Sequence, residues 1–129
     1  MTRRIHTITL FLLAALTLAS ASGKVSAGII GSCNNTAGGI CVEYTGAGYK
    51  DIKSLQRVCE AQTVTFLAGS PCPIGERVGT CVRNKGKPTE TQYRYYSNFP
   101  GSGPKVSKKG VAAQGQRQCK PPKGEWIVD

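Results

Sequence analysis

The stretch "GSCNNTAGGICV", residues Gly31–Val42, decides how the chain is interpreted, because a similar stretch follows later. The second stretch, "GSPCPIGERVGTCV", covers Gly69–Val82, and both open with Gly-Ser and close on Cys-Val. Each leads into aromatic residues, a polar segment that ends in a cysteine, and a short β-like run, "TVTF" or "EWIV". This internal repeat indicates two related strand-helix-strand halves, residues 31–68 and 69–129, although cysteine-rich chains also produce such matches by chance.

Two polar segments have the pattern of helices. In "KDIKSLQRVCEAQ", Asp51 is placed to cap the first turn, and one face carries apolar residues at helical spacing, namely Ile52, Leu55, Val58 and Cys59. The segment "SKKGVAAQGQRQC" has Ser107 as its cap and is ended by two prolines. Between the helices, "RNKGKPTE" predicts a hairpin turn that leads into the strand "QYRYYSNF". We therefore expect a small α+β domain.

The cysteine count indicates that disulfides stabilise this domain. An even number of cysteines in a short exported chain is typical of a disulfide framework, and each bond adds about 2–4 kcal/mol of stability. The apolar core must be small, because glycine, proline and polar residues are plentiful. The six cysteines are Cys33, Cys41, Cys59, Cys72, Cys81 and Cys119.

The spacing of the cysteines does not determine which of them pair. If the two halves are related, the favoured sets of disulfides are those that stay the same when the halves are exchanged. We favour a set that joins each strand to its own helix, because such bonds compensate for a thin core. The favoured set is Cys41–Cys59, Cys81–Cys119 and Cys33–Cys72. The alternative set is Cys33–Cys41, Cys72–Cys81 and Cys59–Cys119.

The N-terminus has the three-part layout of a secretory signal peptide. Basic residues precede an apolar run, Ile8–Ala19, which is shorter than the roughly 20 residues that a transmembrane helix needs. We expect cleavage after Ala21, so that residues 1–21 are removed, with Ala27 as the alternative. The rest, residues 22–129, then forms one domain that is periplasmic or extracellular. A lipoprotein anchored through Cys33 is a minority interpretation, because it would leave an odd number of cysteines.

The charge is strongly positive. The chain carries a formal charge of +10, and without Arg3 and Arg4 the balance is 15 basic against seven acidic residues. Such a protein is attracted to anionic surfaces, acidic glycans and nucleic acid. We expect an anionic surface, a glycan or a protein as partner, and no specific nucleic acid. Nothing in the sequence indicates the oligomeric state.

Several short motifs resemble those of small, exported, cysteine-rich proteins of Gram-negative bacteria. They are "CVEYTG", "VCEAQ", "RVGTCV", "YRYYS" and a last cysteine shortly before a tryptophan. The resemblance covers nearly all of the expected mature chain, but the segment after Phe99 is more basic and richer in glycine than in that group. It implies location and architecture, and it implies no activity.

The residues that are missing exclude several chemistries. The only histidine, His6, lies in the expected signal peptide, so the mature chain has neither a histidine general base nor a histidine metal ligand. We therefore expect no cofactor, no metal and no enzyme activity. A small hydrolase that uses carboxylates or a Ser-Lys pair is the first alternative, with Glu43, Ser54 and Ser107 as residues to test. Each carboxylate is expected to be a solvated surface charge. A cationic toxin or antimicrobial protein is the second alternative.

Two groups of residues are candidates for binding. On the strand "QYRYYSNF", Tyr93 and Tyr95 share one face, whereas Arg94 and Tyr96 share the other. One face can then pack in the core while the other presents an aromatic ring and a cation to a ligand. The second group consists of lysines that lie before and within the later helix. The candidate binding residues are Arg94, Tyr96, Lys105, Lys108 and Lys109.

Overall fold

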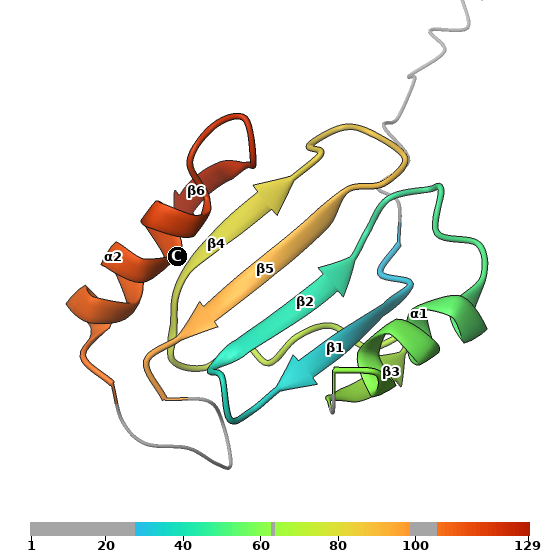
Figure 1. The fold of residues 1–129 in the computed structure, drawn as a ribbon, viewed down its shortest axis with the longest axis horizontal. Helices are drawn as coiled ribbons and strands as arrows, with labels where there is room; N and C mark the ends of the chain where they lie inside the picture. The colour runs from blue at the N-terminus through green and yellow to red at the C-terminus, as the bar shows by residue number, and fades with distance from the viewer. Residues whose placement is uncertain (1–27, 63, 99–105) are drawn as a thin grey trace, which may run out of the picture.

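A computed structural model describes residues 28–62, 64–98 and 106–129 (Figure 1). The expected signal peptide, both of its cleavage positions and Lys105 lie outside these ranges. Six antiparallel strands form one sheet in the order β3-β1-β2-β5-β4-β6. The strands are β1 (Gly31–Asn35), β2 (Ile40–Tyr44), β3 (Thr65–Ala68), β4 (Arg77–Arg83), β5 (Thr91–Tyr96) and β6 (Glu125–Val128). With two helices and three disulfides, this confirms the small disulfide-bonded α+β fold.

Both helices begin at the caps that the sequence predicts. Helix α1 (Ile52–Glu60) starts where the Asp51 carboxylate accepts the backbone N–H groups of Lys53 and Ser54. Helix α2 (Lys108–Gln118) starts where the Ser107 hydroxyl accepts the N–H of Gly110 at 3.1 Å. These bonds satisfy N–H groups that have no partner within the first turn of a helix.

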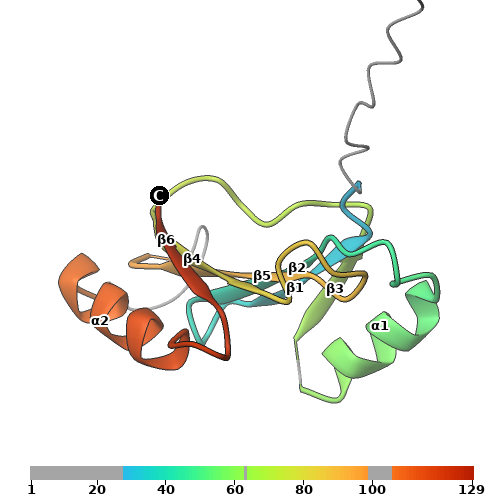
Figure 2. The same ribbon diagram turned by 90° about the horizontal axis from the view of Figure 1, so that it is seen from above.

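The two helices lie on the same face of the sheet, near its opposite ends, and the segment between β3 and β4 crosses the other face (Figure 2). We call the first the helix face and the second the linker face, after the linker of residues 69–76. The predicted turn between β4 and β5 is confirmed as a hairpin, in which Asn84 and Gly86 have positive φ. Since side chains alternate along a strand, neighbouring residues face different partners.

The disulfides correct most of the expected pairing. Cys81–Cys119, which joins β4 to the end of α2, is confirmed. The other two bonds are Cys33–Cys59 and Cys41–Cys72, so the rest of the favoured set and the whole alternative set are wrong. The reason is the sheet register. Cys33 pairs with Val42, so these two side chains lie on the same face of the sheet. Cys41 is the neighbour of Val42, and its side chain therefore points to the other face. Helix α1 lies on the Cys33 side, and the linker reaches Cys41.

The small size of the core also agrees with the sequence. Among the described residues, eleven buried apolar residues form it, and six of them are the cysteines. The apolar side of helix α1 is only partly buried. Leu55 and Cys59 are buried, whereas Ile52 and Val58 are about half exposed. Because every cysteine is in a disulfide, Cys33 has no thiol that could carry a lipid, which corrects the lipoprotein interpretation.

The order β-β-α-β occurs twice along the chain. In both cases the first strand pairs with the second and the third, and a disulfide joins it to the end of the helix. Gly31 lies under the ring of Phe66 on β3, and Gly79 lies under the ring of Trp126 on β6. The stretch Gly31-Ser32-Cys33 thus occupies the place that Gly79-Thr80-Cys81 occupies later, and the Gly-Ser at Gly69 belongs to the linker.

Candidate functional site

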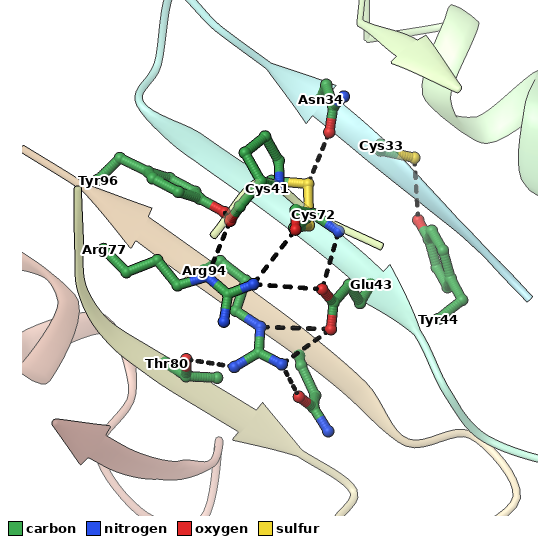
Figure 3. The surroundings of a disulfide bond; sticks show 12 residues. Cys33, Asn34, Cys41, Glu43, Tyr44, Cys72, Arg77, Thr80, Arg94 and Tyr96 are labelled. Carbon is green, nitrogen blue, oxygen red and sulfur yellow. Dashed lines mark hydrogen bonds and ion pairs between the residues drawn. A yellow bond between two sulfur atoms is a disulfide. The ribbon is translucent and has the colours of Figure 1, made fainter. Parts of the chain in front are cut away.

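The linker face contains a buried carboxylate. The Glu43 side chain is 2% exposed, and its Oε2 accepts hydrogen bonds from Arg94 Nη2 at 2.9 Å and Nε at 3.3 Å (Figure 3). Its Oε1 accepts the backbone N–H of Cys72 at 2.8 Å. Glu43 lies between Val42 and Tyr44 on β2, and the expectation that its carboxylate is solvated is wrong. Burial is possible because Arg94 neutralises its charge.

Arg77 fastens the linker over this carboxylate. Its guanidinium donates to the carbonyl of Pro73 at 2.9 Å and to that of Cys72 at 3.2 Å, and it lies 3.9 Å from Glu43 Oε1 (Figure 3). The Tyr96 hydroxyl also donates to the Pro73 carbonyl, at 2.6 Å, and burial raises the pKa of this phenol. Together with the Cys41–Cys72 disulfide, these bonds hold the linker against the sheet.

The same network extends toward the C-terminus. Arg94 Nη1 donates to the Thr80 hydroxyl at 2.8 Å, and this hydroxyl donates to the Asp129 carboxylate at 2.9 Å. With the contacts described above, the carboxylate of Glu43 is held by two guanidinium groups and a backbone amide. These contacts join the sheet to the linker. This arrangement can fix the linker, but it offers a substrate no open carboxylate oxygen.

Of the two serines named for a Ser-Lys pair, Ser54 supports the Asp51 cap of α1 and Ser107 caps α2. The Ser54 hydroxyl donates to the Asp51 carboxylate and accepts a hydrogen bond from Arg57 at 3.1 Å. The Ser107 hydroxyl accepts the Gly110 N–H. The hydrogen bonds from Ser54 lower the pKa of Asp51, which keeps this capping carboxylate charged.

The structure separates the candidate binding residues. Arg94 and Tyr96 lie on the linker face, where their side chains are 17% exposed and buried, respectively. Lys108 and Lys109 are exposed in the first turn of α2, on the helix face. The arrangement therefore does not bring these four side chains to one surface.

A second set of residues, which the sequence analysis did not select, meets on the helix face. Tyr44 and Arg83 both pair with Thr91, so the three residues form a row across β2, β5 and β4. The Arg83 guanidinium lies over the ring of Tyr93, 4.2 Å from its centroid. The rings of Tyr44 and Tyr49 meet edge to face at 5.1 Å. We call Tyr44, Tyr49, Arg83 and Tyr93 the tyrosine surface.

The loop after β2 positions Tyr49 on this surface. The N–H groups of Gly46 and Gly48 donate to the carbonyls of Glu90 and Pro88 at 3.0 and 2.7 Å, which binds the loop to the β4–β5 hairpin. A side chain at Gly46 would strike the Pro88 carbonyl, so the close approach requires glycine. Burial, followed by the neighbouring Tyr93, raises the pKa of Tyr44 and of Tyr49, so both phenols stay protonated at neutral pH.

Taken together, the fold and these contacts define a small α+β protein with three disulfides and a structural ion cluster. No protein-family model, curated protein or solved structure matches the chain. Across residues 28–62, 64–98 and 106–129, no helix is long and apolar enough to cross a membrane. The same residues contain no cluster of three or more potential metal ligands of the His, Cys, Asp or Glu type.

Proposed function

We propose that the protein is exported and acts as a non-enzymatic binding module for an anionic partner. One observation carries this proposal: most of the lysines and arginines that the structure describes have no carboxylate partner. Among the described residues there are three ion pairs, which use Arg77, Arg94 and Lys85. The remaining described lysines and arginines have no carboxylate within 4.0 Å, so their charge is available to a ligand.

The arrangement of the acids supports binding over catalysis. Glu43 is enclosed by arginines, Asp51 caps a helix, and Glu125 pairs with Lys85 at 2.8 Å. A glycosidase needs two carboxyl groups about 5–10 Å apart that face one substrate. The positions of these carboxylates therefore favour a binding role. Three disulfides suit a small protein that works outside the cytoplasm.

Salt-dependent binding to a polyanion tests the proposal. The purified, oxidised protein is applied to immobilised heparin at low ionic strength and eluted with a salt gradient. We expect retention and elution at increasing salt, because the interaction is screened within about 10 Å at 0.1 M salt. Passage through the column at low salt would contradict the proposal.

We also propose that residues 31–68 are related to the later part of the chain by an internal duplication. The shared features are the β-β-α-β order, the Gly-x-Cys stretch on the first strand, and the disulfide from that strand to the helix end. Superposition of the backbone of residues 31–68 on that of residues 79–128 tests this idea. Strands and helix that do not superpose would contradict it.

A further inference from the structure

Arg83 differs from the other arginines in the sheet. Arg77 and Arg94 each bind Glu43, whereas the Arg83 side chain makes no hydrogen bond or ion pair with any described residue. Its side chain is partly buried, and its Nε atom is buried without an acceptor. The two Nη groups of the same guanidinium also have no acceptor among the described residues and, unlike Nε, are not enclosed, so an anionic ligand can accept hydrogen bonds from them.

The Tyr93 ring holds this guanidinium in place. The stacking distance of 4.2 Å between Arg83 Cζ and the ring centroid is typical of a cation–π contact, which leaves the edge formed by the two Nη groups of the guanidinium free to donate. A planar edge of this kind matches a carboxylate or sulfate through two parallel hydrogen bonds. The position is therefore suited to an anionic group.

The acids close to this surface in the chain or in the sheet are all engaged elsewhere. The Glu90 carboxylate accepts the Gly86 N–H at 2.7 Å and the Thr45 hydroxyl at 3.1 Å, and the first of these bonds is the main cause of its lowered pKa. Asp51 caps α1, and Glu125, which pairs with Val82 in the sheet, binds Lys85. None of them neutralises Arg83.

The aromatic residues favour a ligand that is rich in hydroxyl groups. Bases of single-stranded nucleic acid stack on open aromatic faces. Here Arg83 covers one face of Tyr93, and the rings of Tyr44 and Tyr49 meet edge to face. The Tyr49 hydroxyl donates to the Thr89 carbonyl at 3.0 Å and the Tyr44 hydroxyl lies 3.5 Å from Cys33 Sγ, so the surface offers ring edges and phenol oxygens that can still accept a hydrogen bond. Such groups suit the hydroxyls and C–H faces of a sugar chain better than a run of bases.

We propose that the tyrosine surface binds an acidic polysaccharide, with Arg83 as the residue that holds its carboxylate or sulfate groups. This assignment rests on the proposed function, because it names the site and the ligand class for an anionic partner. Tyr93 positions the guanidinium, and Tyr44 and Tyr49 contact the sugar ring.

The test compares two variants that lose the same charge. Arg83→Gln removes the stacked guanidinium, and Lys109→Gln removes an exposed cation from the first turn of α2. Binding of polygalacturonate and of heparin oligosaccharides is measured by calorimetry, with dextran as the neutral polymer and a thymidine oligonucleotide as the nucleic-acid probe. We expect Arg83→Gln to weaken polysaccharide binding at least about tenfold, and Lys109→Gln less than about threefold.

Each outcome has a distinct meaning. Equal weakening by both variants would overturn the site while leaving the anionic partner intact, because only the net charge would matter. Tighter binding of the oligonucleotide than of either polysaccharide would overturn the ligand class. Absence of binding to every polyanion would overturn both the site and the proposed function.

Two further variants allow for a failure of Arg83→Gln to fold. Arg83→Lys keeps the charge but loses the planar edge, and we expect it to bind several times more weakly than the parent protein. Tyr93→Leu removes the ring under the guanidinium and should weaken binding with little change in the salt dependence. Parent-like affinity in both variants would overturn the proposal.

Discussion

Substitution of Glu43 by glutamine tests whether the buried ion cluster holds the linker. Glutamine has nearly the same shape, so the change removes the charge while the packing is kept. Glu43 is 2% exposed, and its partners Arg94 and Arg77 are 17% and 18% exposed. Removal of one partner from a buried pair costs about 3–5 kcal/mol, because the other charge stays buried. We expect a loss of about 3 kcal/mol in the free energy of unfolding, since one amide oxygen remains as an acceptor.

The matched control is Glu125→Gln. It also removes one carboxylate from an ion pair, but Lys85 and Glu125 are 58% and 56% exposed. Exposed pairs contribute about 0–1 kcal/mol. Urea unfolding of both variants under non-reducing conditions measures the difference. A loss below about 1 kcal/mol for Glu43→Gln, equal to the control, would refute the reasoning.

Three further results are expected. Gly79→Ala should lower the free energy of unfolding by about 1–3 kcal/mol, because the methyl group would strike the Trp126 ring, whereas Gly75→Ala has open space and should change little; equal stabilities in urea would contradict this contact. Ser107→Ala should cost about 1 kcal/mol through the lost cap of α2, and unchanged thermal unfolding would argue against that role. Because the folded-state pKa of Glu90 is lowered, its stabilisation is present above the ordinary carboxyl pKa and is lost as the pH falls through the folded-state pKa; Glu90→Gln should flatten stability against pH on the acid side, and an unchanged profile would contradict it.

The sequence was sufficient for the local elements. Asp51 and Ser107 identify the helix starts because a cap needs only a side chain and the next few backbone amides. The hairpin after β4 was predictable for the same local reason. Alternation also placed Tyr93 and Arg94 on opposite faces of their strand.

The parts that depend on the order of the strands could not be predicted. Glu43 and Arg94 are 51 residues apart, and they meet only because β2 pairs with β5. The disulfide of Cys41 with Cys72 requires knowledge of which face the linker crosses. Arg83 was missed because the alternation of a single strand does not show which face the helices leave open.

Binding of an anionic partner through the tyrosine surface is most directly tested by an NMR titration of the oxidised protein with heparin oligosaccharides. The account predicts that the largest backbone amide shifts map to the residues around Tyr44, Tyr49, Arg83 and Tyr93, and that they diminish as salt is added. Shifts confined to the first turn of α2, or no shifts at low ionic strength, would contradict it.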